Sequence, residues 1–202
     1  GYDPAYMGVK LPFPQPNKAL RPFAAKRKDA PEEIELKYYY YSVIQHAIRK
    51  MPMVSAINVD GDPAKRQDDS EREDKWLRDV RIDLEAQLTD KFYANSGFDK
   101  GHMSRREDAN YADNPNDAKL FADMTCMHTN ACPQVGKLNR SSSKGLWGRL
   151  EKVILEKGVS VESGKQSRIS VYNGPIFAES DPVFRGVQIP MEFWKMVVWR
   201  DD

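Results

Sequence analysis

Runs of aromatic and β-branched residues constrain the fold of this chain more than any other feature. They cover residues 36–44, 53–59, 168–177 and 194–199. Such residues fit the pleated, half-buried surface of a β-sheet. The link over residues 45–52 is compatible with a helical turn or with a hairpin, and the third run is expected to end in a turn at Gly174 and Pro175. The pattern predicts mostly antiparallel strands.

Apolar residues at helical spacing indicate helices between these strands. The clearest helix is expected over residues 141–158, with serines 141–143 as its cap and Gly158 as a left-handed C-terminal cap. Its apolar positions are Leu146, Trp147, Leu150, Val153 and Ile154. A second helix is expected to start at Asn116. Its apolar face would contain Leu120, Phe121 and Met124. Residues 76–84 fit a weak helix or a polar connector. The fold class is therefore α+β, with helices packed on a central sheet.

Length and composition indicate the domain organisation. A chain of 202 residues is long enough for one domain with a core of its own. Residues 1–34 are proline-rich and basic and are expected to form an extended surface arm, with the domain proper over residues 35–202. The sequence has no run of 18 apolar residues, so no transmembrane helix is expected. Its net charge is +1, so nucleic-acid binding would depend on local charge.

The cysteines and the ends of the chain bear on its processing. Cys126 and Cys132 are too few for a disulfide-rich scaffold, and they fit one disulfide in an exported protein or two buried thiols. The chain begins at Gly1 rather than at a methionine and stops soon after an apolar run. We therefore expect a longer parent polypeptide with a regulatory or delivery module.

The stretch over residues 98–103, Phe-Asp-Lys-Gly-His-Met, is the first candidate for chemistry. The sequence lacks Cys-x-x-Cys, His-x-x-x-His, Gly-x-Ser-x-Gly and Walker-type patterns. The stretch lies in a segment, residues 94–116, that is expected to be a long irregular loop, and such loops are usually functional. His102 suits a general base near neutral pH, and Lys100 could hold an anion beside it. A loop histidine that only bonds to a carbonyl fits this stretch equally well.

A second stretch, residues 129–151, offers oxygen ligands. The amide oxygens of Asn130, Gln134 and Asn139 and the carboxylate of Glu151 are hard donors that suit Mg²⁺, an ion that keeps most of its waters. Loop asparagines usually serve turns, however, and a helical glutamate usually faces water. Residues 137–152 have a net charge of +4, which suits phosphate but also fits an ordinary solvated helix face.

Together these segments resemble the DNA/RNA non-specific endonuclease family, the ββα-metal nucleases that include endonuclease G and secreted bacterial nucleases. The family motif Asp-Arg-Gly-His stands here as Asp99-Lys100-Gly101-His102. The later motifs follow in order as Thr129-Asn130, Pro133-Gln134, Leu138-Asn139, Trp147-x-x-Leu150-Glu151, residues 172–177 and residues 189–195. The resemblance runs from about residue 35 to residue 200. It implies the ββα-metal nuclease fold.

The resemblance also implies an activity, which is hydrolysis of DNA and RNA to 5′-phosphate products with a single Mg²⁺, or with Mn²⁺ in its place. His102 would be the general base that takes a proton from water. Asn139 would be the direct protein ligand to the ion, and Glu151 would hold one of its waters. Asn130 and Asp99 would position the histidine and the waters around the ion.

The chain departs from the family pattern at Lys100, where arginine is usual. Lysine keeps the positive charge that would stabilise the phosphate but lacks the planar fork of arginine. An arginine that the family carries before the tryptophan matched by Trp76 is missing, and one of two nearby arginines would take its role. The expected substrate-binding residues are therefore Arg78 or Arg81, together with Arg140 and Lys144. Residues 141–144 resemble an insertion before Glu151.

The implied partners are DNA and RNA, without a membrane, and a homodimer is compatible with the family. Secretion or delivery as an effector is expected rather than residence in the cytoplasm. Two other functions fit the same residues. One is a catalytically weakened or regulated relative that binds nucleic acid or a protein. The other is a phosphodiesterase that acts on small phosphate esters.

Overall fold

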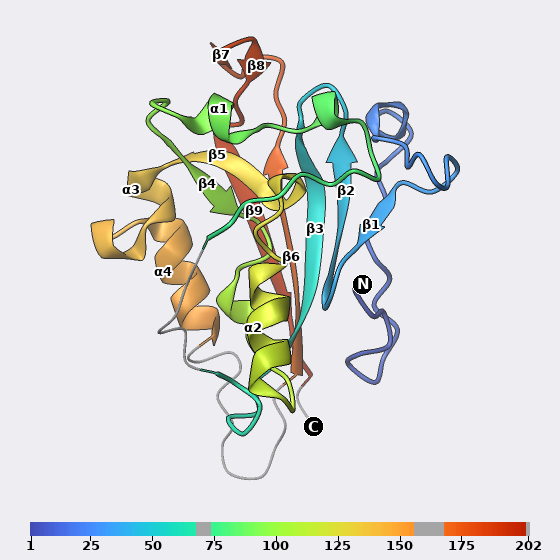
Figure 1. Ribbon diagram of the computed structural model, residues 1–202, viewed down its shortest axis with the longest axis vertical. Helices are drawn as coiled ribbons and strands as arrows, with labels where there is room; N and C mark the ends of the chain where they lie inside the picture. The colour runs from blue at the N-terminus through green and yellow to red at the C-terminus, as the bar shows by residue number, and fades with distance from the viewer. Residues whose placement is uncertain (68–73, 156–167, 201–202) are drawn as a thin grey trace.

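A five-stranded sheet forms the centre of the molecule in the computed structural model, which describes residues 1–67, 74–155 and 168–200. The strand order is β1-β2-β3-β6-β9, and every neighbouring pair is antiparallel (Figure 1). The strands are β1 (Glu35–Lys37), β2 (Tyr41–His46), β3 (Met51–Asp60), β6 (Arg168–Ile176) and β9 (Glu192–Val198). The prediction of a mostly antiparallel sheet is confirmed.

Two further strand pairs and several short helices surround this sheet within the described part of the chain. The pairs are β4 (Phe98–His102) with β5 (Ala131–Val135), and β7 (Val183–Phe184) with β8 (Val187–Gln188). The α-helices are α1 (Asp90–Tyr93), α2 (Pro115–Asp123), α3 (Gly136–Asn139) and α4 (Leu146–Val153). Turns of 3-10 helix lie at Arg21–Phe23, Leu84–Ala86, Glu107–Ala109, His128–Asn130 and Ser141–Ser143. The α+β class is confirmed.

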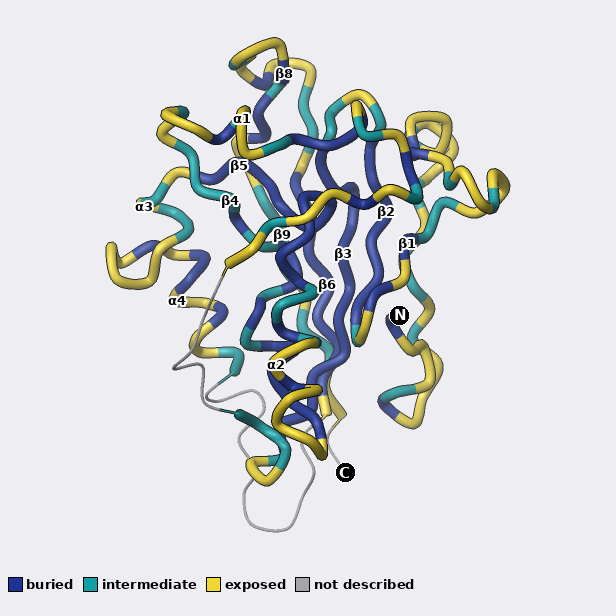
Figure 2. Tube along the Cα trace, in the orientation of Figure 1, coloured by how far each residue is buried: buried dark blue, intermediate teal, exposed yellow. Residues whose placement is uncertain are grey.

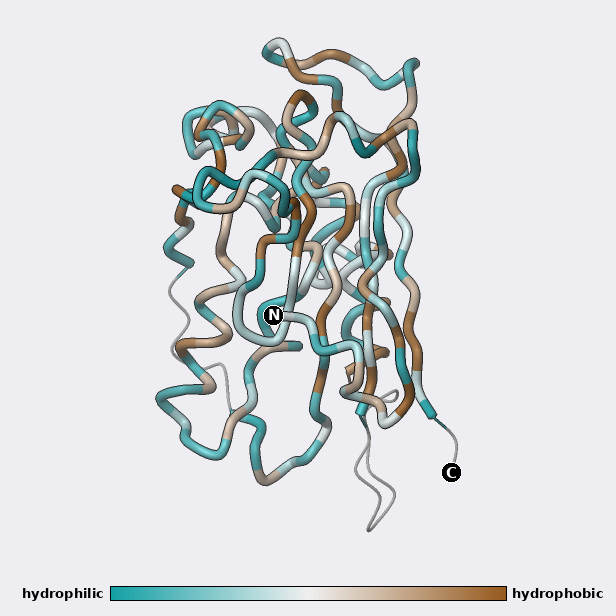
Figure 3. The backbone as a smooth tube through the Cα atoms, turned by 90° about the vertical axis from the view of Figure 1, so that its right-hand side faces the viewer, coloured by the Kyte–Doolittle hydropathy of each residue, from teal (hydrophilic) through white to brown (hydrophobic). Residues whose placement is uncertain are grey.

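The sheet is covered on both faces. Ile57 of β3 belongs to a buried cluster with Met127, whereas its neighbour Ala56 packs against Tyr2. Successive residues of a strand point to opposite faces, so one face meets the layer of helices and loops and the other meets the N-terminal arm. All ten residues of β3 are consequently buried (Figure 2). Figure 3 shows hydrophobic residues recurring along the strands and hydrophilic residues prevailing in the outer loops.

The N-terminal arm is docked on the sheet through its own hydrogen bonds. The backbone N–H of Tyr2 donates to Ser42 Oγ at 2.9 Å, and the N–H of Asp3 donates to Asn58 Oδ1 at 2.6 Å. Tyr2 is buried. The start of the arm is therefore part of the packed structure, and the domain boundary after residue 34 stays a prediction.

The first expected strand is divided into β1 and β2, whereas the second extends beyond its expected ends to form β3. The run over residues 36–44 is interrupted after Lys37, which pairs with Ser42 at the turn between β1 and β2. The link over residues 45–52 is a hairpin, because His46 at the end of β2 pairs with Met51 at the start of β3. Of the two alternatives for this link, the hairpin is correct.

The turn expected at Gly174 and Pro175 is wrong, because both residues lie inside β6 and pair with β9. A Cβ on Gly174 would lie 2.6 Å from the backbone oxygen of Met53, so only glycine permits this approach of two strands. Pairing of β6 with β3 stops at Asn173. Pro175 therefore has a strand neighbour on one side only, where its missing N–H is tolerated.

The helix expected over residues 141–158 starts later than predicted. Serines 141–143 form a separate 3-10 turn, and the N-cap of α4 is Gly145. A Cβ on Gly145 would lie 2.4 Å from the backbone oxygen of Leu138, so the chain turns tightly here and brings α4 against α3. Gly158 lies outside the described residues.

Helix α2 begins close to the expected residue. The side chain of Asn114 caps it by accepting from the N–H of Asn116. Its buried residues are Ala118 and Ala122, whereas Leu120 is 46% exposed. The expected apolar face is therefore only partly correct, because the buried residues of α2 are the two alanines.

Three smaller expectations are also settled. Residues 76–83 form no helix, so the connector alternative is correct. Cys126 and Cys132 are free and buried, which confirms the interpretation as thiols. Across the described ranges, no helix is long and apolar enough to cross a bilayer.

Candidate active site

The β4–β5 pair brings two of the sequence motifs together. Asp99 pairs with Gln134, and Gly101 pairs with Cys132. A Cβ on Gly101 would lie 2.1 Å from Gln134 Oε1, so any larger residue at this position would displace the buried Gln134 side chain. His102 is the last residue of β4 and not part of an irregular loop, which corrects the expectation for residues 94–116. A strand fixes its backbone more firmly than a loop would.

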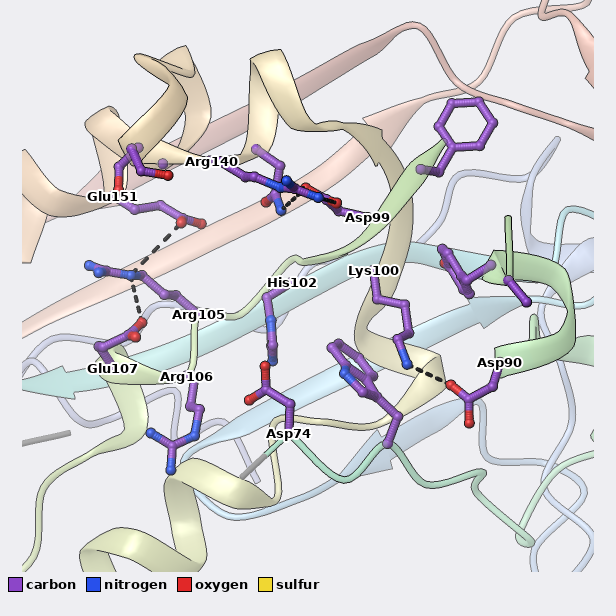
Figure 4. Close-up of a pocket in the computed structure, with 18 residues that line it drawn as sticks. Asp74, Asp90, Asp99, Lys100, His102, Arg105, Arg106, Glu107, Arg140 and Glu151 are labelled. Carbon is purple, nitrogen blue, oxygen red and sulfur yellow. Dashed lines mark hydrogen bonds and ion pairs between the residues drawn. The ribbon is translucent and has the colours of Figure 1, made fainter. Parts of the chain in front are cut away.

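An open cavity of about 690 Å³ lies beside this hairpin (Figure 4). Six of the expected site residues line it, and they come from β4, α3, α4 and the loop that joins the two helices. They are Asp99, Lys100, His102, Asn139, Arg140 and Glu151. Segments that are far apart in sequence, from Asp99 to Glu151, therefore meet in one cavity.

Asp99 holds the amide of Asn139. The Nδ2 of Asn139 donates to Asp99 Oδ2 at 3.1 Å, and the Nε of Arg140 donates to the same oxygen at 2.8 Å. Burial opposes ionisation of Asp99, but the bonds from Arg140 and Asn139 outweigh it and lower its pKa. Because the amide nitrogen of Asn139 is engaged, its amide oxygen is the atom left for a cation.

Glu151 is a buried carboxylate without a hydrogen bond to Oε1. Its nearest cations are Lys195 Nζ at 3.5 Å from Oε1 and Arg105 Nε at 3.8 Å from Oε2. Burial raises the pKa of Glu151 to about 7, although Lys195 opposes this effect. A buried carboxylate oxygen without a hydrogen bond fits a ligand that carries positive charge.

The donors of the cavity fit a hard divalent cation that keeps most of its waters. The amide oxygen of Asn139 and the carboxylate of Glu151 are oxygen donors of the type that Mg²⁺ prefers. In the part of the chain that the structure describes, no three His, Cys, Asp or Glu side chains are grouped to hold a metal. The cavity therefore suits a cation held by few protein atoms.

The pKa of Glu151 predicts how stability depends on pH in the metal-free protein. A carboxyl whose pKa rises from 4.5 to about 7 on folding binds its proton more tightly in the native state. The stability that this tighter proton binding gives the folded state is fully present below pH 4.5. It is lost as the pH rises through about 7, which lowers the free energy of unfolding by about 3 kcal/mol. Urea unfolding in EDTA should show this loss in the wild type, and Glu151→Gln should remove it. An equal pH dependence in both proteins would contradict the assignment.

Asn130 lies behind the cavity rather than in its wall. Its side chain is fully buried, with Oδ1 accepting from the N–H of Ser104 at 2.9 Å. Its Nδ2 donates to the backbone oxygens of Ser104 at 2.8 Å and Thr125 at 3.0 Å. Asn130 thus fixes the backbone two residues after His102, which agrees with a positioning role.

Asn130→Ala is expected to destabilise the protein by about 3 kcal/mol. It would leave a buried N–H and two buried carbonyls without their partner, and each such group costs about 1–3 kcal/mol if unsatisfied. The free energy of unfolding from urea titration measures the loss. Asn116→Ala, at an exposed position of α2, is the matched control and should change stability by less than about 0.5 kcal/mol. Equal stability of the two variants would contradict this role.

The structure places the other expected phosphate contacts in different surroundings. Arg81 is paired with Asp79 at 2.6 Å and does not line the cavity. Lys144 is exposed, in a left-handed turn, and does not line the cavity either. Arg78 lines a second, adjacent cavity. Lys100 lines the main cavity, where its Nζ contacts Asp90 Oδ1 at 2.5 Å.

The sequence does not predict several residues in and around the cavity. Arg105 lines the cavity, where its Nε pairs with Glu107 Oε2 at 2.8 Å and lies 3.8 Å from Glu151 Oε2. Lys195 does not line the cavity but contacts Glu151 from β9. The available signals were the Arg-Arg pair three residues after the histidine and a lysine within an apolar strand. Neither indicates that its side chain meets a glutamate from α4.

His102 itself contacts residues from two other segments. Its ring centroid lies 4.6 Å from that of Trp76, and its Nε2 lies 3.6 Å from Cys126 Sγ. The same sulfur lies 3.7 Å from Asp74 Oδ1, and Figure 4 shows the Asp74 carboxylate beside the imidazole. A half-buried imidazole with an acidic neighbour can accept a proton in the cavity.

Comparisons with known proteins agree with this geometry. A family model described as DNA/RNA non-specific endonuclease matches residues 22–202. The uncharacterized protein y4fB of Sinorhizobium fredii is 32% identical over 211 residues, which cover 100% of this chain and 30% of that protein. A nuclease of Nostoc sp. is 29% identical over 133 residues, which cover 65% of this chain and 43% of that protein. The chain thus spans less than half the length of these two relatives.

A solved structure shows the same fold. A chain in the crystal structure of the EndoG/EndoGI complex superposes with a TM-score of 0.63 and 19% sequence identity. The match covers 83% of this chain and 68% of that chain. The architecture described above is therefore the ββα-metal nuclease fold.

Proposed function

The chain belongs to the DNA/RNA non-specific endonuclease family, and from this premise we propose that it cleaves both DNA and RNA with one bound Mg²⁺, leaving 5′-phosphates. The observation that carries the proposal is the meeting of His102, Asn139 and Glu151 in one open cavity. Each comes from a different motif. Their side chains supply a base, a neutral oxygen ligand and a buried carboxylate.

His102 would act as the general base. Phosphodiester hydrolysis needs a group that removes a proton from the attacking water, and imidazole is well matched to this task near neutral pH. His102 is half-buried, lines the cavity and ends a strand that is held by β5. This support fixes where its ring would meet the water.

Asn139 and Glu151 would hold the cation on the same side of the cavity. Asp99 engages the amide nitrogen of Asn139, and Lys195 and Arg105 flank Glu151. Bound Mg²⁺ supplies positive charge against the phosphate oxygens. Mn²⁺ has similar ligand preferences and is expected to substitute for it.

Lys100 and Arg140 would meet the phosphate from the cavity wall. Both are paired with carboxylates, Lys100 with Asp90 and Arg140 with Asp99. Contacts of this kind address phosphate rather than base edges, so little sequence preference is expected. Recognition of the backbone alone also supports cleavage of both DNA and RNA.

The test uses circular single-stranded DNA and a structured RNA, each incubated with the protein and Mg²⁺. Fragments of both substrates, with 5′ ends that a kinase can label only after phosphatase treatment, are the expected result. Cleavage of neither substrate would contradict the proposed activity. Fragments with free 5′ hydroxyls would contradict the proposed product.

A further inference from the structure

A second cavity of about 450 Å³ adjoins the first and has no role in the mechanism above. The two cavities share Trp76 and Asp90 as walls. The Trp76 ring contacts both histidines of this region, at 4.6 Å from the ring centroid of His102 and 5.9 Å from that of His128. A chain bound at His102 thus has a direct continuation into the second cavity.

The open side of this second cavity carries positive charge. Arg78 and Lys91 line it, and both are exposed. Within the described residues neither forms an ion pair, in contrast to Lys100, which is bound to Asp90 at the shared wall. Two unpaired cations beside a catalytic cavity are suited to a second anion.

Its inner wall contains a buried imidazole, His128, whose Nε2 lies 3.7 Å from Asp90 Oδ1. His128 is 2% exposed, and its Nδ1 has no hydrogen-bond partner. Burial lowers the pKa of His128; Asp90 opposes this, and Lys100 and Arg78 add to it. Arg78 and His128 both line this cavity. A neutral histidine with a free ring nitrogen can accept or donate one hydrogen bond to a ligand.

Apolar surface completes the cavity. Leu77 lines it and is 44% exposed, and the half-buried Trp76 forms the shared wall. A nucleotide has the matching chemistry, since it combines an anionic phosphate with an apolar sugar and base face. Aromatic and apolar walls tolerate every base, because each base has a π-face.

We propose that this second cavity binds the nucleotide next to the cleaved phosphodiester, with Arg78 and Lys91 on its phosphate and Trp76 and Leu77 against its sugar or base. The inference rests on the proposed nuclease function and extends it. According to this inference, the protein contacts at least two consecutive phosphates of its substrate. Substrates with a single phosphodiester therefore lack one of the two contacts.

The test compares a thymidine dinucleotide, which has one phosphodiester and no neighbouring phosphate, with a longer oligothymidylate. The variant is the double substitution Arg78→Ala and Lys91→Ala. The matched control is Lys18→Ala with Arg21→Ala, which removes the same charge from exposed positions of the arm. The ratio of kcat/KM for the long substrate to that for the dinucleotide should fall at least about tenfold in the variant only.

Binding gives a second measurement that does not depend on cleavage. The affinity of metal-free protein for a labelled oligothymidylate, measured in EDTA at several salt concentrations, yields a slope that counts phosphate contacts. Loss of two contacts should reduce the slope of log affinity against log salt by about 1.4 in the variant. An unchanged slope together with an unchanged kcat/KM ratio would overturn the inference. If the wild type cleaves nothing, the nuclease function fails, and the slope alone still decides the inference.

Discussion

Replacing His102 with alanine is expected to lower kcat/KM for DNA cleavage by a factor of about 10²–10⁴, which is the usual contribution of general acid–base catalysis. The side chain is half-buried and lines the cavity, so its loss removes the base without opening the core. The rate should be measured on a fluorescent oligonucleotide at saturating Mg²⁺. The free energy of unfolding, measured in parallel, should change by less than about 1 kcal/mol.

The control for this variant is another histidine in the same molecule. His46 lies at the far end of β2 outside both cavities, and its Nδ1 accepts from the N–H groups of Ile48 and Arg49. His46→Asn keeps an acceptor at this place and should retain wild-type kcat/KM. Full activity of His102→Ala would show that another group takes the proton, and the assignment of the base would then be wrong.

Loss of the metal ligand is the second large effect. Asn139→Ala should weaken Mg²⁺ or Mn²⁺ binding by about 100-fold or more, because even substitutions beside a metal ligand cost 10–100-fold in affinity. Isothermal titration calorimetry with Mn²⁺ measures the affinity directly, without reference to cleavage. Activity should fall in parallel and recover in part when the metal concentration is raised.

The fold around Asn139 should survive this substitution. Asp99 would lose the bond from Asn139 but keep the bonds from Arg140, so the β4–α3 contact remains. Asn116→Ala again serves as the control, since it removes an asparagine from an exposed helix. Unchanged Mn²⁺ affinity in Asn139→Ala would contradict the proposed ligand set, whatever the effect on cleavage.

The sheet could be predicted from the sequence because its strands are dense in aromatic and β-branched residues. The local sequence pattern did not predict the position of Gly174 and Pro175, because this pair is typical of a turn. Their fit inside β6 depends on the approach of Met53 from β3 and on a missing neighbour beyond Asn173. These two features belong to the tertiary structure, and they override the local preference of Gly174 and Pro175 for a turn.

Much of the candidate site could be anticipated from its motifs, whereas its electrostatic surroundings could not. The motifs around His102, Asn139 and Glu151 do meet in one cavity. The cations that flank Glu151 come from β9 and from the segment after β4, and no spacing rule connects Lys195 with Glu151. The sequence also does not show that Arg81 pairs with Asp79 whereas Arg78 lines the second cavity. The choice between the two arginines stays a prediction.

The most direct test of the central claim is the conversion of supercoiled plasmid by the wild-type protein in Mg²⁺, in EDTA, and in EDTA followed by excess Mg²⁺. We expect nicked and then linear plasmid in the first and third reactions and none in the second. This result would establish endonuclease cleavage that depends on a divalent cation. Intact plasmid in all three reactions, or equal cleavage in EDTA, would contradict it.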